Sequence, residues 1–310
     1  MVDSIRSLRT RRALLAGFLV LVAISLAAWL AISLAAGTGQ TKGASYHFRW
    51  YITYDSIFAP DGSIISGLWL TISVSVIAQV LGVGLGILAA LAKMARIWPF
   101  RIVSNLYIWF FRGTPLILQL SFLFYGIQTT RVFTWPLIDF GPIVIAPEVV
   151  AGVVILGVNE GAYMAEIVRA GILAIDPGQT EAAKSLGMTY SQTMRRIVLP
   201  QAARVIIPPL GNEFNNMLKN TSLLSALSIF ELYYTFSSKA NTTLIYFEYM
   251  IACCFWYLLL TTIWGFVQAW IERRFSKGTT TSSAGPGWRE RLLGGRRRQQ
   301  AEEIAILGGH

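Results

Sequence analysis

Charged residues are scarce in this chain. Only 14% of its 310 residues are Asp, Glu, Lys or Arg, against roughly 25% in soluble domains. By contrast, 54% of the residues are apolar. Because a soluble surface needs more charge than this, the composition excludes an ordinary soluble domain and favours a protein that crosses a membrane several times.

Cysteine and histidine are scarcer still. The two cysteines, Cys253 and Cys254, are adjacent within an apolar run, and the two histidines, His47 and His310, are far apart. This spacing excludes a disulfide framework and a Cys/His metal site, so we expect no bound metal and a packing role for both cysteines. It also leaves no nucleophile with a nearby histidine inside an apolar run, so we do not expect an enzyme.

The chain also lacks a phosphate-binding loop of the form GxxxxGKS or GxxxxGKT. Such a loop holds the phosphates of ATP through its backbone N–H groups and its lysine. If ATP drives this protein, a partner subunit must therefore bind the ATP and Mg²⁺, and we expect no cofactor in this chain.

Six apolar runs are long enough to cross a bilayer, whose hydrocarbon core of about 30 Å requires about 20 helical residues. They cover residues 13–36, 63–92, 102–127, 147–172, 205–236 and 244–271. The first run follows several arginines, as the apolar part of a secretory signal peptide would. It is longer than the roughly 7–15 apolar residues of such a peptide, so we favour a retained span.

Basic residues between the runs predict the orientation, because Lys and Arg concentrate in cytoplasmic loops. With the N-terminus inside, nineteen basic residues fall on the cytoplasmic side, and those on the other side are Lys42, Arg49, Arg131 and Lys239. We therefore predict an all-α membrane protein with six transmembrane helices and both termini cytoplasmic. The net charge of +10 is spread over these loops, which favours contact with anionic membrane lipid over nucleic acid.

This topology divides the chain into three parts. Residues 1–62 hold the cytoplasmic N-terminus, the first span and an extracytoplasmic loop. Residues 63–272 form the main transmembrane domain, with a polar cytoplasmic loop at 174–204. Residues 273–310 are rich in Gly, Ser, Thr and Arg, which predicts a flexible basic tail, either solvated or resting on lipid headgroups.

The polar loop at 174–204 begins with a helix signal. Asp176, Pro177 and Gln179 have the order of an N-cap, a first-turn proline and a capping-box partner. Helix-forming residues follow, and Gly187 is placed to end the helix in the left-handed conformation.

A second helix signal follows in the same loop. Thr189 with Gln192 predicts another capping box, and Pro200, which has no N–H, is expected to end that helix. The loop therefore predicts two short helices joined at Gly187. A DNA-reading helix-turn-helix is disfavoured, because membrane spans stand on both sides of the loop.

The same loop resembles a known motif in its residues and their spacing. The matching residues are Glu181, Ala182, Ala183, Gly187, Ile197, Leu199 and Pro200. They are similar to the EAA loop in the permeases of bacterial ATP-binding-cassette importers, which docks into a cleft of the ATP-hydrolysing subunit. The resemblance implies that these residues couple the chain to two copies of such an ATPase subunit.

Other stretches resemble the polar amino-acid branch of these permeases, which carries histidine, glutamate, glutamine, arginine or opines. They are GLWLTISVSV from Gly67, FRGTPLILQL from Phe111, GAYMAEIVRAGI from Gly161 and LKNTSLLS from Leu218. Asn220 and Ala170 depart from the branch, which has Asp and Gly there more often. The resemblance covers about residues 63–272 and implies a type I importer core of five helices in the bacterial inner membrane, with one extra N-terminal helix.

The resemblance also implies partners beyond the ATPase. These are a second permease subunit, identical or homologous, an extracytoplasmic solute-binding protein, and a polar amino acid as the transported solute. The residues alone leave open an ion-coupled secondary transporter, because carboxylates and cations inside spans would also suit a proton relay. An importer of the first kind requires ATP and the binding protein, whereas a secondary transporter works alone.

Ionisable groups inside the apolar runs mark a possible substrate pathway, because they are costly in hydrocarbon. Arg112 lies eleven residues after Arg101, roughly 16 Å along a helix and so near the middle of the membrane. Thr114 follows it, and Pro115 frees a backbone carbonyl that can line a path. The alternative is an arginine near the headgroups at a helix bend.

Two further runs carry polar stripes at helical spacing. Asn159 and Glu166 share one face of the fourth run, with Tyr163 between them, and Glu213, Asn216 and Lys219 recur along the fifth. Such stripes face protein or water, either for hydrogen bonds and Glu–Lys pairing between helices or for contact with the solute. The predicted substrate-pathway residues are thus Arg112, Thr114, Asn159, Glu166, Glu213, Asn216 and Lys219.

Overall fold

The computed structural model describes residues 48–142 and 144–275, and these are almost entirely helical. The predicted first span at 13–36 and nearly all of the basic tail lie outside the described residues. Within them, the strand structure is a small antiparallel hairpin of β1 (Ile138–Asp139) and β2 (Val144–Ile145).

Three helices coincide with predicted spans and are long and apolar enough to cross a membrane. They are α3 (Gly62–Met94), α7 (Pro147–Leu173) and α12 (Tyr246–Phe275). A fourth candidate is a bent pair, α4 (Trp98–Gly113) followed by the helical segment Leu116–Thr129. The described residues therefore contain three or four spans, and the six-helix count and the orientation stay predictions.

The predicted fifth span at 205–236 is not one helix. Its first part belongs to α10 (Leu199–Asn220), which is followed by the 3₁₀ helix η3 (Thr221–Leu227) and, after a turn, by α11 (Leu232–Thr243). The turn passes through Ser228, whose φ of +58° is left-handed and cannot continue a helix. Such a turn cannot be predicted from apolar composition alone.

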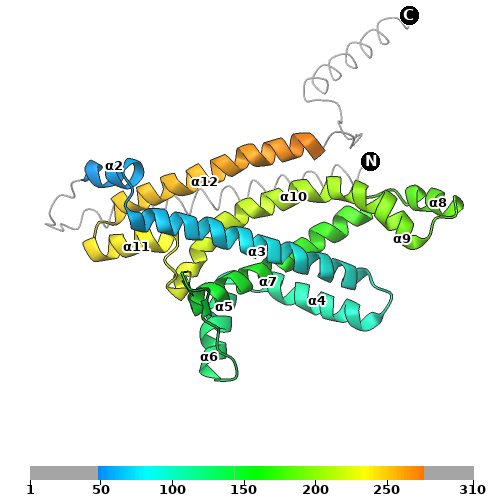
Figure 1. Cartoon of the computed structure of the whole chain (residues 1–310), viewed down its shortest axis with the longest axis horizontal. Coiled ribbons are helices and arrows are strands. Elements are labelled where there is room, and N and C mark those ends of the chain that lie inside the picture. The colour runs from blue at the N-terminus through cyan, green and yellow to red at the C-terminus, as the bar shows by residue number, and fades with distance from the viewer. Residues whose placement is uncertain (1–47, 143, 276–310) are drawn as a thin grey trace, which may run out of the picture. The chain divides into compact units, whose positions relative to one another are not determined.

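The long helices pack side by side. α10 contacts α3, α7 and α12, and α3 and α7 form the most extensive pair. In Figure 1 the short helices α8 (Pro177–Ser185) and α9 (Tyr190–Thr193) lie at one end of this bundle, whereas α2 (Trp50–Phe58) and α11 lie at the other end. The polar loop at 174–204 is thus separated from α2 and α11 by the length of the long helices.

Glycines bring α3 and α7 close together. Gly82 and Gly86 on α3, and Gly157 and Gly161 on α7, each follow the GxxxG spacing. A Cβ on Gly82 would lie 2.8 Å from the Cβ of Glu160, and a Cβ on Gly157 would lie 2.6 Å from Leu81 Cδ2. Larger residues would push the two helices apart, as at close helix contacts within membranes.

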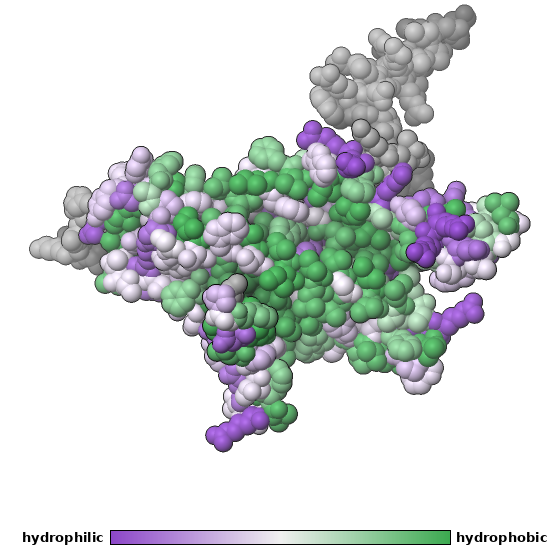
Figure 2. Space-filling view, viewed as in Figure 1, coloured by the Kyte–Doolittle hydropathy of each residue, from purple (hydrophilic) through white to green (hydrophobic). Residues whose placement is uncertain are grey.

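The surface of the bundle is hydrophobic along its middle. Figure 2 shows hydrophobic residues over the long helices and hydrophilic residues gathered towards the two ends. Large apolar side chains are exposed there, for example Trp109 at 72% and Phe266 at 73%. This surface suits lipid chains rather than water, because a soluble protein rarely exposes so large an apolar area.

A buried carboxylate joins three helices at the α11 end. Glu231 is wholly buried at the N-cap of α11. Its carboxylate accepts hydrogen bonds from the N–H groups of Tyr233 at 2.9 Å and Tyr234 at 2.7 Å, and from the hydroxyl of Tyr257 on α12 at 3.0 Å. The hydroxyl of Thr71 on α3 in turn accepts from the N–H of Leu232 at 3.1 Å. These bonds fix the start of α11 against α3 and α12.

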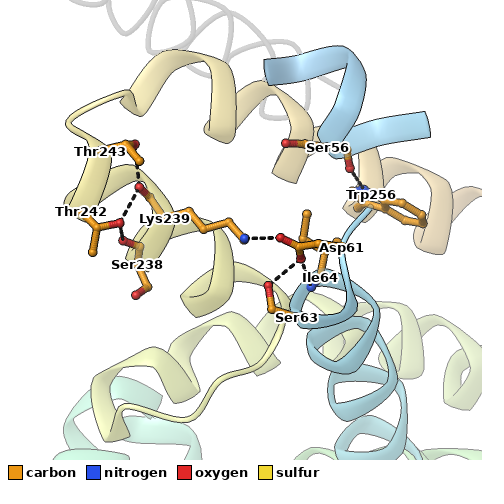
Figure 3. A network of polar contacts seen from close by, with 9 residues as sticks. All are labelled: Ser56, Asp61, Ser63, Ile64, Ser238, Lys239, Thr242, Thr243 and Trp256. Carbon is orange, nitrogen blue, oxygen red and sulfur yellow. Dashed lines mark hydrogen bonds and ion pairs between the residues drawn. The ribbon is translucent and has the colours of Figure 1, made fainter. Parts of the chain in front are cut away.

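An ion pair also links α3 to α11. Asp61, the N-cap of α3, accepts hydrogen bonds from Ser63 and from the N–H of Ile64, and it pairs with Lys239 of α11 (Figure 3). Burial raises the pKa of Asp61, but the bonds from Lys239, Ser63 and Ile64 outweigh burial and lower the pKa to about 2. The carboxylate is therefore ionised at every physiological pH.

Candidate functional site

The helix is interrupted between α4 and α5 (Leu116–Ser121), at Thr114 and Pro115, and we call this interruption the break. Thr114 has extended torsions, φ −116° and ψ 147°, and the helical segments on either side meet at a bend of 106°. Because a proline has no N–H, the carbonyl of Phe111, four residues before Pro115, loses its helical partner. The break leaves a backbone acceptor that needs a donor from elsewhere.

Two buried amides supply the donors. Asn159 Nδ2 on α7 donates to the Phe111 carbonyl at 3.0 Å, and Gln119 Nε2 on α5 donates to the same oxygen at 2.9 Å. Gln119 also donates to the Thr114 carbonyl at 3.0 Å, and its Oε1 accepts from Asn159 at 2.9 Å. These bonds hold the broken helix against α7.

A cavity of about 550 Å³ opens beside the break. We call it the polar cavity. It lies between the break, α7, α10 and η3, and its lining residues are Thr114, Leu116, Asn159, Glu160, Tyr163, Glu213, Asn216, Lys219, Asn220 and Leu223. The structure thus brings together five of the predicted pathway residues: Thr114, Asn159, Glu213, Asn216 and Lys219.

The charged groups of the polar cavity are not paired with one another. Glu160 is only 3% exposed, and its Oε1 has no hydrogen-bond partner in the described part of the chain. Glu213 accepts a hydrogen bond from Asn216 Nδ2 at 3.3 Å. Neither Glu213 nor Lys219 takes part in the ion pairs of residues 48–142 and 144–275, which are Lys93–Glu166, Arg169–Glu166 and Lys239–Asp61. The cavity can therefore offer charges of both signs to a solute.

Arg112 lies beside the polar cavity but does not line it. Its side chain is exposed, and its guanidinium carbon lies 5.3 Å from the ring centroid of Tyr163, which does line the cavity. The favourable cation–π geometry gives Arg112 a partner on α7. Arg112 takes part in none of the ion pairs among the described residues.

Glu166 does not line the polar cavity either. It lies seven residues after Asn159, about 10 Å further along α7. There its carboxylate pairs with Lys93 of α3 at 2.5 Å and with Arg169 at 2.8 Å. Glu166 therefore joins α7 to α3 and is already neutralised by two cations.

The loop at 174–204 begins as predicted. Asp176 is the N-cap of α8, with its side chain accepting from the N–H of Gly178 at 2.8 Å, and Pro177 stands in the first turn. The predicted capping box with Gln179 is wrong, because the Asp176 carboxylate bonds to Gly178 instead. This is a common alternative, since an N-cap oxygen reaches either the second or the third N–H of a helix.

Gly187 ends α8 in the left-handed conformation, as predicted, with φ +78°. The N–H of Gly187 donates to the Lys184 carbonyl at 2.9 Å, and the N–H of Met188 donates to the Ala183 carbonyl at 3.1 Å. This pair of bonds defines a Schellman motif. A Cβ at Gly187 would meet nothing within 4 Å, so the backbone conformation rather than space requires glycine.

The second helix of the loop has the predicted start but not the predicted end. Thr189 and Gln192 form the capping box. Pro200 does not end the helix, because α9 passes through the π-helical turn Met194–Val198 directly into α10, where Pro200 lies in the first turn. A proline is tolerated where the local ladder does not use its N–H. The loop is therefore joined to α10 without a break in the helical backbone.

The predicted coupling residues differ in exposure. Glu181, Ala182, Gly187, Leu199 and Pro200 are exposed, Ile197 is half-buried and Ala183 is buried. Ala183 therefore packs within the loop, whereas the exposed residues leave a surface open to a partner.

Gln119 and Glu160 were not among the predicted pathway residues. Gln119 lies four residues after Pro115, where its amide reaches carbonyls of the preceding break. Glu160 is adjacent to the predicted Asn159, and its Oε1 has no hydrogen-bond partner among the described residues. An amide one turn after a proline, and an acidic residue inside an apolar run, are the signals that point to them.

Comparison with known proteins places the chain in a family. Residues 82–277 match the model of the binding-protein-dependent transport system inner membrane component. The chain belongs to this family. The permease resemblance expected from the EAA loop is therefore confirmed.

Similar proteins include two bacterial permeases. The arginine transport system permease protein ArgU of Corynebacterium glutamicum is 38% identical over 262 residues, covering 84% of this chain and 79% of ArgU. The L-cystine transport system permease protein TcyB of Bacillus subtilis is 36% identical over 216 residues, covering 68% of this chain and 86% of TcyB.

Solved structures agree with this placement. A crystal structure of an amino acid ABC transporter with histidines matches with a TM-score of 0.64 and 36% identity, covering 74% of this chain and 99% of the matched chain. A methionine ABC transporter in inward-facing conformations matches with a TM-score of 0.56 at 18% identity, over 69% of this chain and 96% of its own. The second likeness concerns the fold alone.

The two amides at the break yield a stability prediction. Asn159→Leu should leave the Phe111 carbonyl and the Gln119 side chain short of a donor, at a cost of about 1–3 kcal/mol. We expect a lower thermal unfolding midpoint in lipid nanodiscs. Asn212→Leu on α10 is the matched control, because Asn212 is exposed. Equal midpoints for the two variants would contradict the role given to Asn159.

Proposed function

We propose that this chain is the permease subunit of an ATP-driven, binding-protein-dependent importer of polar amino acids. Family membership and the names of its relatives, permeases for arginine and for L-cystine, support this function. In this proposal the chain has six transmembrane helices and cytoplasmic termini, and it pairs with an identical or homologous permease. Two ATPase subunits hydrolyse ATP, and an extracytoplasmic protein delivers the solute.

The observation that carries the solute class is the unpaired charge in the polar cavity. A free amino acid carries an ammonium and a carboxylate, and both are costly to move into a membrane protein unless each finds an opposite charge. Glu160 and Glu213 suit the ammonium or a cationic side chain, and Lys219 suits the carboxylate. Thr114, Asn159 and Asn216 would contribute hydrogen bonds, with Arg112 at the edge.

The coupling step would run through the loop at 174–204. The exposed residues Glu181, Ala182 and Gly187 offer a docking surface at the end of the bundle (Figure 1). Because α9 continues through a π turn into α10, a movement of the loop would be passed to Glu213, Asn216 and Lys219 on the same helix. The polar cavity could thereby alternate between inward- and outward-facing states as ATP binding shifts their populations.

Transport in reconstituted vesicles tests the function. Proteoliposomes that contain the permease, its ATPase subunit and internal ATP should accumulate the labelled amino acid only when the loaded binding protein is outside. Uptake by the purified chain alone under a proton or sodium gradient would contradict the proposal and favour an ion-coupled secondary transporter.

A substitution at Gly187 tests the coupling loop. Gly187→Val places a β-branched residue at φ +78°, which costs about 1–2 kcal/mol in the left-handed region. We expect about tenfold weaker retention of the ATPase subunit on purification, since 1.4 kcal/mol corresponds to tenfold, with normal membrane insertion. Gly187→Asn is the control, because asparagine tolerates this conformation. Equal retention and uptake by both variants would contradict docking at this loop.

A further inference from the structure

Helix α2 exposes aromatic side chains on its outer face. Successive residues of a helix turn by about 100°, so Tyr51, Tyr54 and Phe58 lie within about 60° of one another. Their exposed fractions are 62%, 62% and 67%. The buried residues of α2 are Ile52, Thr53 and Ser56. An aromatic outer face over a partly polar inner face fits an apolar or interfacial environment better than water.

Hydrogen bonds fix α2 rigidly to the start of α12. The N–H of Arg49 donates to Glu248 Oε1 at 2.9 Å, and Thr53 Oγ1 donates to the Glu248 carbonyl at 3.3 Å. One turn further along α2, the Ser56 carbonyl accepts a hydrogen bond from Trp256 Nε1 at 3.0 Å (Figure 3). The inner face of α2 is therefore attached to α12, and its aromatic face points outwards.

The aromatic face of α2 continues into the apolar face of α12. The ring of Tyr54 lies 4.8 Å from that of Phe58, and Phe58 lies 6.4 Å from Phe255 of α12. From Phe255 towards the C-terminus of α12, the exposed residues are mainly apolar, including Leu258, Ile263 and Phe266. The exposed aromatic residues of α2 thus meet the exposed apolar residues of a helix that is long and apolar enough to cross the membrane.

The lengths of the helices place α2 at the membrane boundary. α12 has 30 residues, about 45 Å at 1.5 Å per residue, so it exceeds a hydrocarbon core of about 30 Å by about 7 Å at each end. Phe255, nine residues after Tyr246, then lies about 6 Å inside the hydrocarbon. Phe58 touches it at that depth, and Asp61 follows at the water-exposed start of α3.

We propose that α2 is an interfacial anchor whose Tyr51, Tyr54 and Phe58 side chains insert among the phospholipid headgroups and upper acyl chains at one face of the membrane. Tyrosine suits this layer because its ring is apolar and its hydroxyl remains hydrated. By fixing the depth of α12 and of the neighbouring start of α3, the anchor holds the bundle in register with the bilayer. This role does not depend on which solute is transported.

Photo-cross-linking of the assembled transporter tests the anchor. The permease carries p-benzoylphenylalanine at position 54, or at 51 or 58 in separate variants, and is assembled with its ATPase subunit in nanodiscs of phosphatidylethanolamine and phosphatidylglycerol. The binding protein is added in excess before illumination. We expect the intact mass of the permease to rise by one phospholipid at each of the three positions.

Leu186→p-benzoylphenylalanine is the matched control, because Leu186 is 83% exposed on the cytoplasmic loop at the opposite end of the bundle. It should give a lipid adduct several-fold less often than position 54 and should instead cross-link to the ATPase subunit, because it lies beside Gly187 in the proposed docking loop. ATPase activity of the variants at positions 51, 54 and 58 shows that they are assembled. Cross-links from positions 51, 54 and 58 to the binding protein or to a second permease would overturn the anchor. So would illumination that yields no lipid adduct at any of the three positions.

Discussion

One backbone carbonyl, that of Phe111, sets the local architecture on which the polar cavity depends. Pro115 denies it a helical partner, and an unpaired carbonyl away from water is costly. The amides of Asn159 and Gln119 satisfy it at 3.0 Å and 2.9 Å. The break between α4 and α5 is therefore satisfied locally by Gln119, and the bond from Asn159 ties it to α7. The same contact places Thr114 and Leu116 in the wall of the polar cavity.

The charged residues of the polar cavity differ in their contacts from Glu166 and Glu231 elsewhere in the described bundle. Glu166 is neutralised by Lys93 and Arg169, and Glu231 is fixed by hydrogen bonds from backbone and tyrosine. These carboxylates hold helices together. Neither Glu160, which is buried, nor Lys219, which is exposed, has an ion pair among the described residues. Under the proposed function, a zwitterionic solute would supply opposite charges for both.

The sequence predicted some parts of this structure better than others. α3, α7 and α12 follow from the lengths of apolar runs, because crossing a bilayer is a requirement on length and hydropathy alone. The turns at Gly187 and Thr189 follow from local capping chemistry. Local signals of this kind depend on few residues, so they can be predicted without knowing the tertiary contacts.

Tertiary contacts explain the parts that could not be predicted. Nothing in the fifth apolar run marks Ser228 as left-handed, because serine takes this conformation only when its surroundings enforce it. The Phe111 carbonyl is bonded by Asn159, which is 48 positions away in the sequence, and by Gln119, which is 8 positions away. The spacing of Glu166 predicts a pathway residue, yet its carboxylate forms an ion pair with Lys93, which is distant in the sequence.

The most direct test of this account is a cryo-electron microscopy map of the assembled transporter with a saturating concentration of the amino acid that its binding protein carries. The account predicts density for the amino acid in the polar cavity, with its carboxylate at Lys219 and its ammonium or cationic side chain at Glu160 and Glu213. An amino acid bound elsewhere in the permease, or a polar cavity closed by a direct Glu213–Lys219 ion pair, would contradict it.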